Sequence, residues 1–339
     1  MFKSLFSIIF MLVSSLSFAN EVNIYTSRHY DSDDQLYEDF RKETGIKINV
    51  ISGNGNALLE RLKSEGKNSP ADIFFTVDAG NLWKIQKEGY FQSISSLKAL
   101  SVVPINLIGP NNEWIAIAKR ARVIFYNPKT VSDEELIDLS YENLSSDEWN
   151  GRVVIRSSSN IYNQSLVASL ISTHGIEQTE EWAKGFVSNL ARKPQGNDRS
   201  QIMAVANGLA DLAIANSYYY GYMLSGKAGN DQVKAAKKVK MFFPNQNTRG
   251  VHINISGLGV LKNAKNIDNA NRFIEFLLSR EMQSNMVNNS FEYPVLSDVS
   301  PHPDIASSGL GFLEDKMQVS EYGKFNSEAI KLMDRAGWK

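Results

Sequence analysis

Tyrosine side chains follow three separate predicted strands, and they are the strongest candidates for chemistry in this sequence. His29 and Tyr30 follow the first predicted strand, Tyr162 follows a central one, and the tyrosine run 218–220 follows a later one. An ionised phenol is a hard anionic oxygen donor, which suits hard metal cations. Taken alone, the run 218–220 is more typical of aromatic packing in a strand and His29 of an ordinary loop histidine, while Tyr162 alone is uninformative. A phenol-lined site is therefore predicted only if the three strand ends meet across one cleft.

The first part of the chain alternates between predicted strands and helices. The strands are 22–26, 47–51 and 72–76, and the helices are 32–42, 56–65 and a third that begins at 78–81. Ser32 with Gln35 three places on is a capping-box pattern, and Gly45 and Gly66 end the first two helices. This order predicts a mostly parallel sheet flanked by helices, with ligands at the carboxyl ends of its strands.

A basic stretch separates two further predicted strands, 114–118 and 123–126, and we place the first crossing between lobes there. A second series then follows, with strands 153–156 and 211–215 and helices 164–173, 179–190 and 200–207. The segments 241–244 and 257–261 are expected to return the chain to the first lobe. Two long helical patterns, 268–287 and 314–336, form the C-terminal part.

A chain that leaves one α/β lobe, builds another and returns predicts two lobes joined by hinge strands. We expect residues 20–119 and 257–339, including the C-terminal helices, in the first lobe. Residues 120–256 are expected to form the second lobe.

The N-terminus predicts export. Met1, Phe2 and Lys3 give a short basic start, an apolar run covers residues 5–13, and Ser17-Phe18-Ala19 has the small-x-small pattern of a signal-peptidase site. The apolar run is shorter than the roughly 20 residues that a spanning helix needs. We therefore expect residues 1–19 to be a cleaved signal peptide and the mature chain to begin near Asn20.

Composition narrows the classes of function. The chain has no cysteine, which excludes an N-terminal lipid anchor on cysteine, disulfides and iron-sulfur clusters. Its 36 basic and 37 acidic residues give a net charge of −1, so a nucleic-acid partner is not expected. G-x-S-x-G, H-E-x-x-H and a cysteine nucleophile are all absent, so we expect no enzyme.

The chain resembles the periplasmic ferric-ion-binding proteins of iron ABC importers, and within them the FutA type of cyanobacteria. The resemblance covers essentially the whole mature chain. It is carried by five segments: YTSRHYD at 25–31, DIFFTVDAG at 72–80, WNGRV at 149–153, SSSNIYNQS at 157–165 and NSYYYG at 216–221. It implies the type II periplasmic binding protein fold and a single ferric ion carried between the lobes.

The resemblance also implies a ligand set. Its members would be His29, Tyr30, Tyr162, Tyr218 and Tyr219. Within the tyrosine run we prefer the first two residues to the last two, because Asn216 and Ser217 correspond to the residues before the family's pair. Four phenolates around Fe(III) leave one negative charge, which a dry cleft tolerates only with a nearby cation. Arg28 and Arg122 are the expected cations, and Arg156 and Arg199 are weaker candidates.

The function expected from these features is capture of Fe(III) by hinge closure and delivery, as a monomer, to an inner-membrane ABC permease. Fe(II) is an alternative if His29 ligates and one phenol stays protonated. A binding protein for an oxyanion, a polyamine or thiamine is a further alternative with the same fold. Those solutes need backbone amides, acidic groups or aromatic stacking, and they do not explain tyrosines in all three loops.

Overall fold

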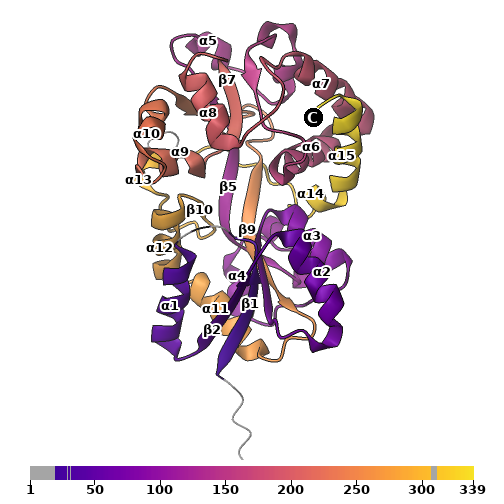
Figure 1. Cartoon of the computed structure of the whole chain (residues 1–339), viewed down its shortest axis with the longest axis vertical. Coiled ribbons are helices and arrows are strands. Elements are labelled where there is room, and N and C mark those ends of the chain that lie inside the picture. The colour runs from indigo at the N-terminus through magenta and orange to yellow at the C-terminus, as the bar shows by residue number, and fades with distance from the viewer. Residues whose placement is uncertain (1–19, 29, 31, 307–310) are drawn as a thin grey trace, which may run out of the picture.

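The structure is a computed structural model that describes residues 20–28, 30, 32–306 and 311–339, so the predicted signal peptide lies outside it. Two lobes lie one above the other and are joined by the long strands β5 (Ile115–Tyr126) and β9 (Ile253–Leu261) (Figure 1). None of the helices within the described residues has the length and apolar character that a membrane span requires.

The first lobe contains the predicted parallel strands. They are β1 (Glu21–Thr26), β2 (Lys47–Ser52) and β3 (Ile73–Val77), in the order β2-β1-β3. Strand β9 pairs antiparallel with β3, and β5 pairs antiparallel with β9. The helices of this lobe are α1 (Asp33–Thr44), α2 (Gly55–Glu65), α3 (Ala79–Lys87) and α4 (Leu97–Val102), and β4 (Phe91–Gln92) pairs with β9. The predicted β-α alternation is confirmed for this part of the chain.

Local signals set the ends of the first two helices. Gly45 ends α1 in the left-handed region at φ 70°, and Gly66 ends α2 at φ 56°, where a glycine meets little steric cost. The predicted capping box at Ser32 does not form, because Ser32 itself has helical backbone angles and its side chain makes no capping hydrogen bond. Asp33, at the first helical position, pairs with Arg28 instead.

Strand β5 is the main correction to the predicted elements. It was expected as two strands separated by a basic stretch, yet it is continuous. Residues 115–121 pair with β9, and residues 122–126 pair with β7 (Leu212–Asn216) of the second lobe. Arg120 and Arg122 stay inside the strand because each guanidinium is buried in contact with a carboxylate. The strand therefore pairs with both β9 and β7, and the predicted crossing between lobes at this point stays a prediction.

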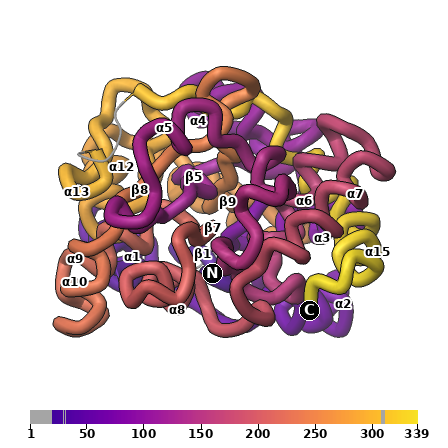
Figure 2. Tube along the Cα trace, turned by 90° about the horizontal axis from the view of Figure 1, so that it is seen from above, coloured from indigo at the N-terminus to yellow at the C-terminus, as the bar shows by residue number. Residues whose placement is uncertain are grey.

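The second lobe is built on β7, with β6 (Val153–Val154) parallel and β5 antiparallel to it, and β8 (Lys240–Phe242) pairs with β5. Its helices are α5 (Asp133–Leu136), α6 (Ile161–His174), α7 (Ile176–Ser188), α8 (Asp198–Ala206), α9 (Tyr218–Leu224) and α10 (Asn230–Ala236). Seen from above, α6 and α7 lie on one side of the central strands and α9 and α10 on the other (Figure 2).

The C-terminal part departs from the prediction twice. The pattern 268–287 is two helices, α11 (Ile267–Leu277) and α12 (Arg280–Ser290), because Ser279 caps the second one. The pattern 314–336 likewise gives α14 (Glu321–Lys324) and α15 (Asn326–Arg335), while α13 (Pro303–Ala306) and β10 (Tyr293–Pro294) are short.

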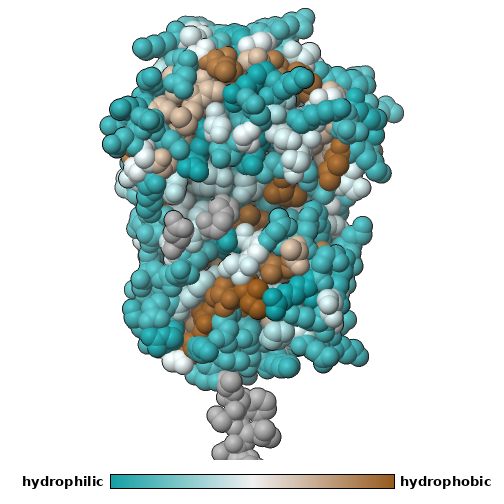
Figure 3. Space-filling view, in the orientation of Figure 1, coloured by the Kyte–Doolittle hydropathy of each residue, from teal (hydrophilic) through white to brown (hydrophobic). Residues whose placement is uncertain are grey.

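The last helix packs on the second lobe, whereas we expected it with the first. Helix α15 contacts α6 and α7, and Arg335 pairs with Glu180 at 2.6 Å. Trp338 packs against Phe186, with ring centroids 5.0 Å apart, which buries a large apolar side chain. The other predicted lobe boundaries stay a prediction. In Figure 3 most of the visible surface is hydrophilic, with apolar patches on both lobes and a broad one across the lower lobe.

Candidate metal centre

Four of the five predicted ligands lie together between the lobes. Tyr30 lies between β1 and α1, Tyr162 in the first turn of α6, and Tyr218 and Tyr219 at the start of α9. The Tyr30 and Tyr218 rings meet edge to face with centroids 5.9 Å apart, and those of Tyr218 and Tyr219 are 4.2 Å apart. Tyr162 is close enough to the other three to interact electrostatically with each. His29 lies outside the described residues.

The third tyrosine of the run faces elsewhere. The Tyr220 ring packs against Phe125, with centroids 5.7 Å apart, and its hydroxyl donates to the Val239 carbonyl oxygen at 3.5 Å. The side chains of the run that join the cluster are thus those of Tyr218 and Tyr219, the pair preferred from the sequence.

Tyr162 occupies a helix terminus, where we had predicted a loop. The Asn160 side chain caps α6 by accepting from the Tyr162 backbone N–H at 3.1 Å. The cap at Asn160 therefore fixes the backbone from which the Tyr162 side chain extends.

Burial opposes ionisation throughout the cluster. It raises the pKa of Tyr30 and of Tyr218 well above the ordinary value of 10.0, and it also raises the pKa of Tyr162 and Tyr219. The positive charge of Arg120 has the opposite effect and lowers the pKa of Tyr30, Tyr162 and Tyr218. The Tyr218 hydroxyl is buried, and it lies close enough to the hydroxyls of Tyr162 and Tyr219 to lower the pKa of both. The protein thus holds neutral, poorly solvated phenols that only a cation would ionise at ordinary pH.

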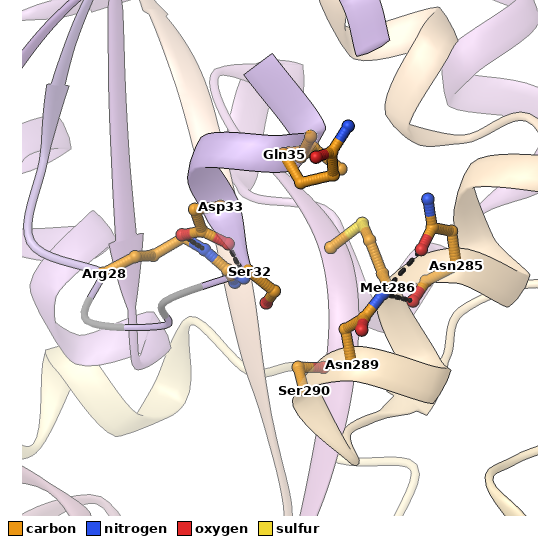
Figure 4. A pocket seen from close by; sticks show the side chains of 9 residues that line it. Arg28, Ser32, Asp33, Gln35, Asn285, Met286, Asn289 and Ser290 are labelled. Carbon is orange, nitrogen blue, oxygen red and sulfur yellow. Dashed lines mark hydrogen bonds and ion pairs between the residues drawn. The ribbon is translucent and has the colours of Figure 1, made fainter. Parts of the chain in front are cut away.

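Arg28 stands beside the cluster, as predicted. Its guanidinium lies 4.5 Å from the centroid of the Tyr30 ring and donates to both carboxylate oxygens of Asp33, at 2.8 and 2.9 Å. Figure 4 shows this pair facing Asn285, Met286, Asn289 and Ser290 of α12 across a small pocket. A third contact reaches Glu292 at 3.5 Å. These partners hold Arg28 in place under Tyr30.

Arg122, the second predicted cation, is 6.0 Å from the Tyr162 ring centroid. It donates to Asp198 at 2.5 Å and to the Asn163 side chain at 2.7 Å. Arg156, one of the weaker candidates, reaches the same Asp198 at 3.4 Å. Since Asn163 is the neighbour of Tyr162, Arg122 also fixes the start of α6. Arg199 is not part of these ion pairs.

Two buried charges at the centre were missed by the sequence reasoning. Arg120 lies 5.5 Å from the Tyr162 ring centroid, and its guanidinium is 3.7 Å from the Glu292 carboxylate. Glu292 also accepts from the Ser256 hydroxyl at 2.6 Å. The available signal was a pair of arginines within a strongly apolar run, because buried arginines require charged partners. No motif or spacing in the sequence points to Glu292.

Charged side chains of both signs surround the tyrosines. They comprise four arginines and four carboxylates: Arg28, Arg120, Arg122 and Arg156 with Asp33, Asp198, Glu292 and Asp78. Asp78 forms none of these ion pairs, but its carboxylate raises the pKa of Tyr162 and is itself stabilised by Arg120. The arginines are therefore placed where they oppose the negative charge of the carboxylates and of ionised phenols.

Other donor sets are scarce. Among residues 20–28, 30, 32–306 and 311–339, no group of three or more histidine, aspartate and glutamate side chains could hold a metal ion. The tyrosine cluster is therefore the best-supported candidate for a metal centre in this part of the chain.

A cavity of about 280 Å³ adjoins the cluster on one side. Tyr30, Tyr218 and Tyr219 form part of its wall, and Arg199 and Lys227 add two cationic side chains. The remaining lining residues are Ser32, Asn197, Tyr222, Asn289 and Ser290. Residues of both lobes thus surround a polar space that reaches the phenols.

Known proteins resemble this chain over nearly its full length. Iron uptake protein A1 of Synechocystis is 50% identical over 319 residues, which are 94% of this chain and 88% of that protein. The Trichodesmium FutA (IdiA) structure with iron and citrate is 52% identical with a TM-score of 0.89, covering 94% of this chain and all of that one. The ferric binding protein of Campylobacter jejuni is 38% identical with a TM-score of 0.87, again covering 94% and 100%.

These matches confirm the predicted fold, a two-lobed α/β periplasmic binding protein of type II, and the resemblance to iron-binding proteins. They also place the chain among transport proteins and not among enzymes. The family model for bacterial extracellular solute-binding proteins matches residues 68–308. The chain is therefore a member of the bacterial extracellular solute-binding protein family.

Proposed function

We propose that this protein is a periplasmic carrier that holds one Fe(III) ion between its lobes and delivers it to an ABC importer. The ligands would be the phenolates of Tyr30, Tyr162, Tyr218 and Tyr219, with His29 as a fifth donor. The observation that carries the proposal is the meeting of these four tyrosines from both lobes, with rings 4.2 and 5.9 Å apart in two of the pairs.

The chemistry of the cluster suits a ferric ion. Fe(III) is a hard cation that prefers anionic oxygen, and tyrosine is an established ligand of iron in proteins. A trivalent charge can displace the phenolic protons that burial otherwise retains. Arg120, which lowers the pKa of Tyr30, Tyr162 and Tyr218, would stabilise the phenolates once they have formed. A softer or less charged solute gives no reason for four buried phenols beside arginines.

Delivery would depend on the hinge. Tyr30 belongs to the first lobe and the other three tyrosines to the second, so neither half should bind the ion tightly alone. Iron would then stabilise the closed arrangement, and that shape is what an inner-membrane permease would recognise. A monomer suffices for this mechanism, because one chain supplies the whole site.

A direct test is titration of the mature protein with ferric and ferrous salts, aerobically and anaerobically, with metal stoichiometry and the visible spectrum recorded together. One equivalent of Fe(III) should give an intense phenolate-to-iron charge-transfer band. Tyr162→Phe should remove most of the band and weaken binding strongly. Tyr220→Phe is the matched control, since its hydroxyl lies at the Val239 carbonyl group and outside the cluster.

A colourless loaded protein, or an unchanged band in Tyr162→Phe, would contradict the proposal. The anaerobic arm tests Fe(II) as the alternative cargo, for which His29 would ligate and one phenol would stay protonated. Binding of Fe(II) with equal stoichiometry and no visible band would favour that alternative.

The cavity beside the cluster suggests the form in which iron arrives. The Trichodesmium relative was solved with iron and citrate, and Arg199 and Lys227 give this cavity two cations. We propose that it accepts the carboxylates of a small iron chelate. Ferric citrate should then load the protein without prior release of the free ion, which stopped-flow absorbance can measure.

A further inference from the structure

We propose that Asp78 is a positioning residue that fastens the two lobes together beside the tyrosine cluster and so sets how tightly the closed protein retains iron. The inference rests on the proposed function for its iron readout. Its geometric part, the fastening of the lobes, stands on the contacts of Asp78 alone and is testable in the metal-free protein.

One carboxylate connects three elements. Asp78 precedes α3 in the first lobe, and its Oδ1 accepts from the Gly80 backbone N–H at 2.8 Å. The same oxygen accepts from the Ser165 hydroxyl of α6, in the second lobe, at 2.7 Å. The Asn254 side chain, on the hinge strand β9, donates to Oδ2 at 2.9 Å. All of these contacts are buried.

The contact acts close to a proposed ligand. Ser165 lies three residues after Tyr162 on α6, so the two side chains are neighbours on one turn of the helix. A hydrogen bond that holds Ser165 against the first lobe also holds the start of α6 there. Gly80 leaves room for the Asp78 carboxylate, because an added Cβ would lie 3.1 Å from its Oδ1.

The backbone of Asp78 indicates that its position is maintained against a local cost. It is a non-glycine residue at φ 76°, a conformation that L-residues rarely adopt. Its side chain is fully buried, and no described lysine or arginine lies within 4.0 Å of the carboxylate, although Arg120 acts on it electrostatically. The carboxylate therefore relies on its hydrogen-bond donors, and one of these belongs to the opposite lobe.

The test removes only the donor from the opposite lobe. Ser165→Ala leaves the α3 cap and the Asn254 contact intact. Ser169→Ala is the matched control, because Ser169 is buried one turn further along α6 and its hydroxyl donates to the Leu166 carbonyl group within that helix. Small-angle scattering of each metal-free protein reports how far the lobes are apart, and transfer of iron to excess EDTA reports the dissociation rate.

We expect Ser165→Ala to have a larger radius of gyration without metal and to lose iron about tenfold faster, with the charge-transfer band unchanged in position. Ser169→Ala should match the wild type in both measurements. Asp78→Asn, which also disturbs the Asn254 contact, should release iron at least as fast as Ser165→Ala. A purely structural role would lower the melting temperature and shift neither scattering nor release.

Equal scattering and equal iron release in Ser165→Ala and the wild type would overturn the inference. The two proposals fail in distinguishable ways. If the iron proposal is wrong, the wild type itself shows no charge-transfer band, while the scattering comparison still decides whether Asp78 fastens the lobes.

Discussion

The two sides of the cleft between the lobes differ in construction. On one side α3, α6 and α14 pack directly, with Ser165 bonded to Asp78 at 2.7 Å and Asn326 bonded to Gln164 at 3.0 Å. On the other side lies the cavity of about 280 Å³. The helices around it are α1 and α12 in the lower lobe and α8 and α9 in the upper lobe (Figure 1). The difference suggests that one side holds the lobes together while the other admits the ion.

The tyrosine cluster lies between these sides, and its dependence on pH should be the largest effect. All four phenols have a raised pKa, with burial as the main cause, so they are protonated at neutral pH and would have to lose protons to act as the proposed iron ligands. Each displaced proton makes the affinity fall about tenfold per unit of acidification, which amounts to roughly 10⁴-fold per unit for four phenols.

Competition with a chelator of known pH dependence, between pH 5 and 8, measures this slope and counts the displaced protons. A slope near one per pH unit would mean that a single phenolate binds, and the picture of four converging ligands would fail. Tyr220→Phe should leave the slope unchanged, because that hydroxyl is not in the cluster.

Arg120 lies at the crossing point of the hinge, and its loss should disturb both sides. Arg120→Met would leave Glu292 buried with weaker compensation, which costs about 3–5 kcal/mol for a broken buried pair. It would also remove the cation that lowers the pKa of Tyr30, Tyr162 and Tyr218, so iron binding should need a higher pH. Urea denaturation and ferric titration measure the two effects, and Arg120→Lys should retain part of each.

Arg120 also shows where sequence reasoning reached its limit. The strand ends that carry the tyrosines were predictable, since β-α alternation and helix-ending glycines are local signals. The continuity of β5 was not, because an arginine is tolerated within a strand only when a distant carboxylate meets it. Glu292 lies 172 residues further on, and no local pattern reports such a contact.

Two other differences between the predicted and the observed structure have causes of the same kind. Tyr162 was expected in a loop because the capping role of Asn160 was not recognised, although Asn is a favoured residue for that position. Helix α15 was assigned to the first lobe by chain order alone. Its position depends on the packing of Trp338 against Trp182 and Phe186, which lie more than 150 residues earlier in the sequence.

The side of the cleft where α3, α6 and α14 pack directly, called the packed side below, can be weakened without changing any polar group. Gly323 of α14 lies against Trp83 of α3, and an added Cβ would come within 2.1 Å of that side chain. Gly323→Ala should therefore push α14 away and destabilise the protein by about 1–3 kcal/mol, as overpacking does. Gly55→Ala is the control, since its added Cβ would meet only ordinary contacts at 3.6 Å or more. Equal urea midpoints for both variants would mean that α14 is not essential to the packed side.

The smallest effect is expected from Lys227, which lies on the side of the cleft that contains the cavity, called the open side below. Its ammonium group lies 3.4 Å from the Asn289 carbonyl oxygen, across the cavity mouth from its own lobe, and it lines the cavity that reaches the phenols. A single exposed charge changes how often an anion arrives more than how tightly the bound ion is held.

Lys227→Met should slow loading by ferric citrate about threefold at low salt, and about 1 M salt should abolish the difference. Lys331→Met, on α15 and 63% exposed, removes the same charge far from the cavity and should load at the wild-type rate. If both variants slow loading equally, the net charge of the protein attracts the chelate. The open side would then not be the route of entry.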